Sequence, residues 1–243
     1  MSGGAVYQEA LRLLRRQGLP ELAERDVLVA LEAGQPGPLP FLYEAGAEAG
    51  LPRELLMPRA AGIFFSFCAG NLADDVIDGD CNYYVEPLRV APYVQFTLQN
   101  LAWATLARAG LTTEALAGGA SALVAAAGPQ ALEVRTREWT ADVYREVAEG
   151  IAGQQWAAYL RLLWSGTALA ERAAAAGRGL GVAAHVAEDV RSEDARFFSM
   201  PPAHQQEVLA WAREAADGVR RWELRCLGAA LRGIEELLPK EAA

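Results

Sequence analysis

Residues 63–80 read IFFSFCAGNLADDVIDGD, an apolar helical run that continues without a breaker into Asp74, Asp75 and Asp78. At about 100° per residue, Asp74 and Asp78 lie one turn apart on the same helix face, and Asp75 lies to one side. Carboxylates at the end of a largely buried helix repel one another and resist desolvation. Mg²⁺ relieves this penalty, because it binds one or two carboxylates together with phosphate oxygens. The alternative is a solvated acidic helix end.

The composition around this run favours a helical, acidic, cytoplasmic protein. Hydrophobic residues make up 52% of the 243 residues, Ala and Leu dominate, and no stretch alternates as a strand does. The net charge of −9 argues against a general nucleic-acid surface. We expect no signal peptide, because the first residues lead into an amphipathic segment, and no membrane span, because no 18-residue apolar run lacks charge. The sequence therefore predicts an all-α bundle of about eight to ten helices in a single domain, residues 1–243.

Apolar spacing and Pro/Gly breaks set the expected helix bounds. Residues 34–40 form a loop rich in Pro and Gly, and residues 80–87 form a second loop. The helices are expected over 5–17, 20–33, 40–50, 52–79, 88–109, 112–127, 129–164 with interruptions at Gly150 and Gly153, 167–194 and a last helix whose apolar positions run from Val208 to Leu237.

A second acidic cluster ends another apolar run, LGVAAHVAEDVRSED at residues 180–194. Asp189 and Glu193 are expected to share a helix face, with Glu188 and Ser192 beside them. His185 lies one turn below Asp189. A lone histidine in such a position is more often a hydrogen-bonded core residue than a metal ligand. Because metal sites in helical bundles take ligands from facing helices, we expect the two acidic clusters to face one another.

Three motifs in order resemble those of the class I isoprenoid synthases, a family that includes polyprenyl diphosphate synthases and terpene cyclases. Asp74-Asp75-Val76-Ile77-Asp78 resembles the first aspartate-rich motif, DDxxD. Residues 150–154, GIAGQ, resemble the GxxxQ helix break, and residues 180–189 resemble the run into the second aspartate-rich motif. The matches cover roughly residues 60–200. The resemblance implies an all-α bundle around a deep central cavity.

The resemblance also implies a set of site residues. Three Mg²⁺ ions would bridge the acidic clusters and an allylic diphosphate, with the aspartates of the first motif also counted as catalytic. The implied metal ligands are Asp74, Asp75, Asp78, Glu188, Asp189 and Ser192. The implied diphosphate-binding residues are Arg145, Gln154 and Arg191, with Arg135 and Arg137 as competitors of Arg145. The implied prenyl pocket comprises Ile63, Phe67 and Gly70, on the helix face below Asp74, and Trp156.

The chemistry explains these residue types. Ionisation of an allylic diphosphate separates a carbocation from a pyrophosphate anion, so the developing negative charge needs metal ions and arginine. The cation needs a dry, apolar and aromatic pocket, because water would quench it. The alternative role for each aromatic residue is ordinary core packing. The alternative for each arginine is a solvated position at the surface.

The sequence departs from the chain-elongating branch of the family. That branch binds isopentenyl diphosphate through basic segments near the N-terminus and just after DDxxD. Here residues 34–40 carry no basic residue, none follows Asp78 until Arg89, and the only lysine is Lys240. In the second motif, Glu188 and Ser192 replace aspartates. Residues 189–192, DVRS, instead resemble the core of the terpene cyclase motif (N/D)DxxSxxxE, although its closing Glu falls on Arg196.

We therefore expect Mg²⁺-dependent ionisation of a prenyl diphosphate followed by carbon–carbon bond formation, by a one-substrate enzyme similar to terpene synthases. The first alternative is a polyprenyl diphosphate synthase that condenses its substrate with isopentenyl diphosphate. The second is a non-catalytic, regulatory member of the same fold, for which the altered second motif argues. Because homodimers are usual in the family, a homodimer is expected.

Overall fold

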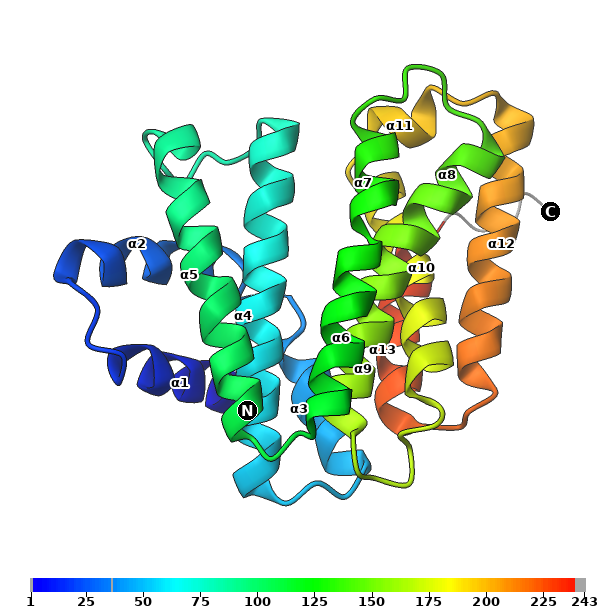
Figure 1. Ribbon diagram of the computed structural model, residues 1–243. Coiled ribbons are helices and arrows are strands. Elements are labelled where there is room, and N and C mark those ends of the chain that lie inside the picture. The colour runs from blue at the N-terminus through cyan, green and yellow to red at the C-terminus, as the bar shows by residue number, and fades with distance from the viewer. Residues whose placement is uncertain (1, 36, 239–243) are drawn as a thin grey trace. The chain divides into compact units, whose positions relative to one another are not determined.

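The computed structural model describes residues 2–35 and 37–238, and within them every regular element is a helix (Figure 1). This confirms the predicted all-α class. Pro36 of the predicted loop and Lys240 lie outside the described residues. By contacts the chain divides into two compact units, Met1–Leu116 and Ala117–Ala243. The single domain stays a prediction, and each unit is described by itself.

Unit 1 is built around one long helix, α4. Its helices are α1 (Ser2–Arg15), α2 (Glu21–Ala33), α3 (Leu39–Glu48), α4 (Arg53–Asp78) and α5 (Pro87–Arg108). All four other helices pack on α4, and its middle turn is buried completely at Ile63, Phe64 and Phe65. Pro52 precedes α4, and Gly79 ends it in the left-handed conformation with φ 81°, which a residue with a side chain rarely adopts.

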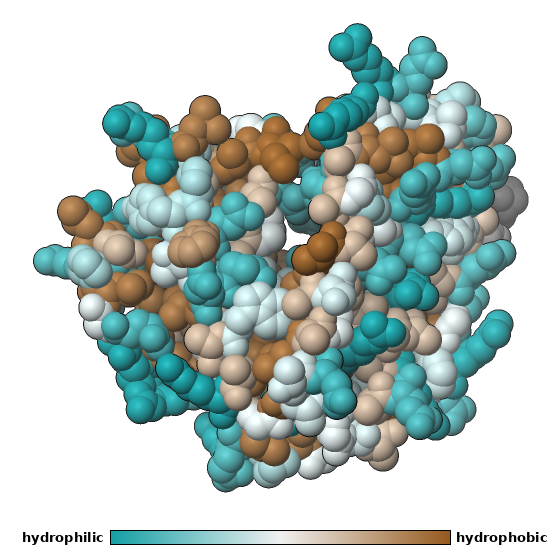
Figure 2. Space-filling view, viewed as in Figure 1, coloured by the Kyte–Doolittle hydropathy of each residue, from teal (hydrophilic) through white to brown (hydrophobic). Residues whose placement is uncertain are grey.

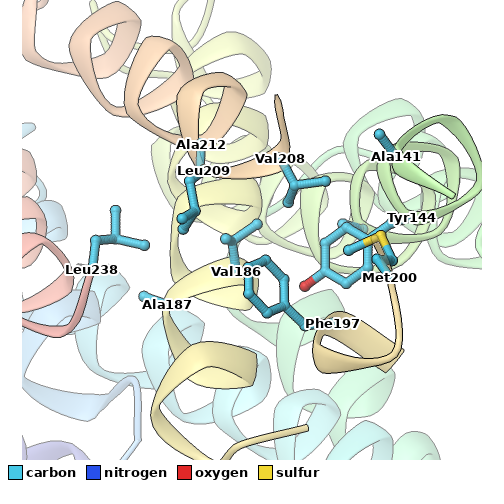
Figure 3. Close-up of a cluster of buried hydrophobic side chains, with 11 residues drawn as sticks. Ala141, Tyr144, Val186, Ala187, Phe197, Met200, Val208, Leu209, Ala212 and Leu238 are labelled. Carbon is cyan, nitrogen blue, oxygen red and sulfur yellow. The ribbon is translucent and has the colours of Figure 1, made fainter. Parts of the chain in front are cut away.

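Unit 2 is organised around α10. Its elements are α6 (Thr113–Ala125, which begins in unit 1), α7 (Ala127–Glu133), α8 (Ala141–Ala148), the π-helix η1 (Glu149–Gly153), α9 (Gln154–Trp164), α10 (Ala173–Arg191), α11 (Ala195–Phe198), α12 (Pro202–Arg220) and α13 (Arg225–Leu237). Helices α8, α9, α11, α12 and α13 and the π-helix all pack on α10. Figure 3 shows Val186 of α10 close to Phe197, within a cluster that also includes Tyr144.

The structure corrects several predicted bounds. The expected helix over 129–164 is interrupted at residues 134–140, and Thr140 then caps α8 by accepting a hydrogen bond from the backbone N–H of Val143. The expected last helix breaks at residues 221–224, where Glu223 adopts φ 54°. The helix expected from residue 167 begins at Ala173. The described residues therefore form thirteen α-helices and one π-helix, more than the eight to ten expected.

Two helical stretches are long and apolar enough to cross a membrane. This corrects the expectation that the chain has no stretch of that kind. The first is Arg53–Asp78, and its most apolar window is 56% buried, as in a core helix. The second is Thr113–Glu133, which is only 11% buried. Length and composition alone are weak evidence for a span. Figure 2 shows hydrophobic side chains at the surface of the visible face. By exposure, Val85, Leu88 and Phe96 are among the exposed large hydrophobic residues.

Candidate active site

The first acidic cluster lies where α4 ends. Asp74 and Asp78 are exposed and Asp75 is half-buried. The backbone N–H groups of Asp80 and Cys81 both donate to the carbonyl of Asp75, at 2.8 and 2.9 Å. This closing turn satisfies the Asp75 carbonyl in the last turn of the helix and leaves the carboxylates of Asp74 and Asp78 exposed.

Asp75 is fixed by two neighbours that the sequence did not point to. Its Oδ2 atom accepts hydrogen bonds from Asn71 Nδ2 at 3.1 Å and from the Tyr83 hydroxyl at 2.7 Å. Burial and the adjacent Asp75 carboxylate raise the pKa of Tyr83 well above its usual value, so the phenol stays a donor. Asn71 is one turn before Asp75, a spacing that could have identified it. Tyr83 reaches Asp75 only through the fold of the loop after α4.

The donor set suits a metal ion that arrives with its substrate. In residues 2–35 and 37–238, no three His, Cys, Asp or Glu side chains gather into a ready metal group. Mg²⁺ needs no such group, since one or two carboxylates with water and phosphate oxygens complete its shell. The exposed carboxylates of Asp74 and Asp78, and the Oδ1 atom of Asp75, would supply the protein ligands.

Asp189 of the second cluster lies inside unit 2 and is only 4% exposed. The Tyr144 hydroxyl donates to its Oδ2 atom at 2.6 Å, His185 Nε2 lies 3.7 Å from the same oxygen, and Arg196 lies 4.0 Å from Oδ1. Burial and the Asp189 carboxylate raise the pKa of Tyr144 well above its usual value. His185 packs beside Tyr144, with 5.9 Å between the ring centroids, and its 3.7 Å distance from Asp189 is too long for a hydrogen bond, so its hydrogen-bonded core role stays a prediction.

Arg196 is the centre of an ion-pair network that the sequence did not predict. It donates to both oxygens of Asp194, at 2.7 and 2.8 Å, and to Glu133, which lies 63 residues away in the chain. Burial opposes the ionisation of Asp194, but the hydrogen bonds and charge of Arg196 outweigh it, so the pKa of Asp194 lies below its usual value. Burial likewise opposes the charge of Arg196, and its carboxylate partners nevertheless raise its pKa.

The other residues of the second motif point elsewhere. Glu188 is exposed and pairs with Arg191, while the Ser192 hydroxyl donates to the backbone carbonyl of Glu188 at 2.9 Å. Glu193 lies beyond the end of α10 with φ 56°, so it does not share a helix face with Asp189 as expected. Glu188, Asp189 and Ser192 are therefore not gathered into one ligand group in this structure, and their role as metal ligands stays a prediction.

Arg145 contacts α12. Its guanidinium donates to the carbonyl of Glu207 at 3.2 Å and lies within 4 Å of the carboxylates of Asp142 and Glu207. Its Nε atom is buried and has no hydrogen-bond partner among the described residues. To bind a diphosphate, as predicted, Arg145 would have to give up these contacts with Glu207 and Asp142. The diphosphate-binding roles of Arg145 and Arg191 stay predictions.

The GIAGQ stretch forms the π-helix η1 and opens α9 at Gln154. π-Turns inside helices often mark functional sites. Two glycines of α10 allow a close approach here: a Cβ on Gly181 would lie 2.3 Å from the carbonyl oxygen of Ala152, and one on Gly177 would lie 2.3 Å from that of Trp156. The predicted helix break is thus present, with close packing of α10 on η1 and α9 as its structural basis.

The predicted pocket residues differ in burial. Ile63 is completely buried, whereas Phe67 and Gly70 are half-buried on α4. The ring of Phe67 lies against Gly37, since a Cβ on Gly37 would be 3.0 Å from it. Trp156 of unit 2 is half-buried and packs edge-on against Tyr159 at 5.9 Å between centroids. Their role in holding a prenyl tail stays a prediction.

No protein-family model and no curated protein sequence matches this chain. Solved structures do match it along nearly its whole length. A geranyltranstransferase from Thermotoga maritima has a TM-score of 0.78 and 19% identity, over 98% of this chain and 96% of its own. An isoprenoid synthase family member from Thermotoga neapolitana has a TM-score of 0.78 and 16% identity, over 98% of both chains. A polyprenyl synthase from Caulobacter crescentus, complexed with calcium and isoprenyl diphosphate, has a TM-score of 0.69 and 18% identity, over 98% and 96%.

Proposed function

From the isoprenoid synthase fold that this chain has, we propose that it is a prenyltransferase, which ionises an allylic prenyl diphosphate and joins the prenyl group to a carbon acceptor. The observation that carries the proposal is the DDxxD sequence at the solvent end of α4, with Asp74 and Asp78 exposed. Carboxylates in this position would bind a cation that a diphosphate also binds.

The chain's own residues would hold and orient the diphosphate. Mg²⁺, when bound, would neutralise the charge that develops on the leaving pyrophosphate. Asp74 and Asp78 would hold Mg²⁺ at the exposed helix end and through it the diphosphate, which the carboxylates alone would repel. The hydrogen bonds from Asn71 and Tyr83 restrict Asp75 to one orientation, so that little is lost in ordering it when the substrate binds.

The similar structures support the transferase alternative over the one-substrate reading that the sequence favoured. Among them are a geranyltranstransferase, a geranylgeranyl pyrophosphate synthetase from the archaeon Geoglobus acetivorans and a polyprenyl synthase. We therefore place isopentenyl diphosphate first among candidate acceptors. Three Mg²⁺ ions, a homodimer and a cytoplasmic location are carried over as parts of this proposal.

One observation keeps the terpene synthase reading as a second candidate. Residues 34–40 and 79–88 carry no lysine or arginine, and Arg89 is highly exposed and pairs with Glu86. A second diphosphate would lack charge-assisted hydrogen bonds from these segments. An enzyme that rearranges a single prenyl diphosphate has no need of them.

Product analysis separates these candidates. The protein is incubated with Mg²⁺ and geranyl, farnesyl or geranylgeranyl diphosphate, each with and without isopentenyl diphosphate. The transferase proposal predicts longer diphosphates that form only with isopentenyl diphosphate. Hydrocarbons or alcohols formed without it would establish the terpene synthase candidate instead. An absence of turnover with all substrates would refute both and favour the regulatory, non-catalytic alternative.

A further inference from the structure

A charged pocket lies within unit 1, at the opposite end of α4 from the aspartates. It is lined by residues from the end of α1, the start of α4 and the end of α5, and its volume is about 840 Å³, a size common for small-molecule sites. Four arginines line it, Arg12, Arg16, Arg53 and Arg108, against the two carboxylates of Glu9 and Glu54. This local excess of positive charge is opposite in sign to the chain's net charge of −9.

Three of the four guanidinium groups are available to a ligand. Glu9 is occupied by Arg12, through hydrogen bonds of 2.7 and 2.5 Å. The other arginines, Arg16, Arg53 and Arg108, are exposed, and in the described part of the chain none of them forms an ion pair. In a protein with more acids than bases, three unpaired arginines around one pocket favour an anionic ligand.

The start of α4 adds its own positive end to this pocket. Pro52 precedes the helix and makes no side-chain capping hydrogen bond, while the N–H groups of Leu55 and Leu56 return to the Pro52 carbonyl. The N–H groups of Arg53 and Glu54, at the first turn of this 26-residue helix, have no backbone acceptor among the described residues. Such a helix start attracts anions.

The pocket is held in shape by a buried contact. Arg59, one turn and a half further along α4, is only 4% exposed, and its Nε atom donates to the carbonyl of Ala109 at 3.3 Å. This bond joins α4 to the end of α5, directly after Arg108. Leu13, Met57 and Pro58 give the pocket an apolar side as well.

We propose that this pocket binds a small molecule with two or three linked phosphates. Guanidinium forks match phosphate oxygens in pairs, and three of them suit an anion with several charges better than a single phosphate. The apolar side would hold an organic substituent. Along α4 the site is about 30 Å from Asp74, at 1.5 Å per residue, so it is separate from the aspartates. The inference does not rest on the proposed prenyltransferase activity.

Titration calorimetry with inorganic tripolyphosphate tests the proposal on the full chain. The buffer is low in salt and stripped of metal ions with a chelating resin, so that binding through Mg²⁺ at the aspartates is excluded. The wild type should bind. The triple variant Arg16→Gln, Arg53→Gln, Arg108→Gln should bind more than about 100-fold more weakly, roughly fivefold for each arginine.

Two matched variants separate a site from general charge effects. Arg15→Gln removes an exposed arginine of α1 that does not line the pocket, and it should keep the wild-type affinity. Glu54→Gln removes a carboxylate from the pocket and should bind more tightly, a gain that structural damage cannot produce. Circular dichroism would check that the triple variant is folded, as expected for three exposed side chains. Absence of binding by the wild type, or equal affinity of the triple variant, would overturn the proposal.

Discussion

Replacement of Gly181 by alanine tests the close packing of α10 on the π-helix. The added Cβ would lie 2.3 Å from the carbonyl oxygen of Ala152 and 3.0 Å from Trp156 Cδ1. Because the first of these atoms belongs to the backbone, it cannot rotate away, and α10 has to separate from η1 by about 1 Å to restore an ordinary contact.

The expected loss of stability is the difference between two effects. Overpacking of a buried site costs about 1–3 kcal/mol, and the backbone clash puts Gly181→Ala at the upper end. The gain in helix propensity from glycine to alanine returns about 1 kcal/mol. The free energy of unfolding should therefore fall by about 2 kcal/mol, which lowers the Tm by about 4–8 °C in a chain of this length.

Thermal unfolding followed by circular dichroism measures the effect, with Gly218→Ala as the matched control. Gly218 lies in α12, is exposed, and a Cβ there would meet nothing within 4 Å. That variant should gain about 1 kcal/mol and a Tm higher by about 2–4 °C. If Gly181→Ala is as stable as the wild type or follows Gly218→Ala, then α10 does not pack on η1 as closely as described.

Three further predictions concern single side chains. Tyr144→Phe should lower the free energy of unfolding by about 1–3 kcal/mol in urea denaturation, because it removes a hydrogen bond to the buried Asp189; an unchanged midpoint would contradict this contact. The pKa of Asp194 is lowered by folding, so its ionised form stabilises the fold at any pH above 3.8, the pKa of the unfolded carboxyl group. This stabilisation is lost as the pH falls below 3.8. The Tm of the wild type should thus drop further between about pH 5 and about pH 3 than that of Asp194→Asn; equal drops would refute the pairing with Arg196. Phe67→Ala should let longer prenyl diphosphates be used, as seen by mass spectrometry of products; an unmoved substrate range would place the prenyl tail elsewhere.

Much of the fold could be predicted because its signals are local. The bounds of α4 follow from Pro52 and Gly79, each readable within a few neighbouring residues, and the largely apolar stretch between them stays helical although Pro58 lies inside it. The breaks that were missed have weaker signals. Residues 221–224, RWEL, contain neither Gly nor Pro, and yet Glu223 takes a positive φ. Tertiary packing of α12 and α13 on α10 outweighs local propensity there.

The candidate site could be predicted only where spacing along one helix defines it. Asp74 and Asp78 share an exposed helix end as the spacing requires. The sequence shows Arg196 only as a departure from the terpene cyclase motif and does not predict its ion pairs. Its partner Glu133 is 63 residues away, and its proximity to Asp189 depends on how α10 ends. Likewise, nothing in the local sequence tells that Tyr144 donates to Asp189 or that Glu188 points outward.

Release of pyrophosphate from an allylic prenyl diphosphate tests the central claim most directly. Wild type and Asp74→Asn are compared with geranyl, farnesyl and geranylgeranyl diphosphate in the presence of Mg²⁺ and isopentenyl diphosphate. The account predicts release by the wild type and its loss in Asp74→Asn. The thermal stability of that variant without Mg²⁺ should stay level or rise, because an exposed carboxylate is removed from a repelling cluster. Equal release by the two proteins, or none by the wild type with any of the three substrates, would contradict it.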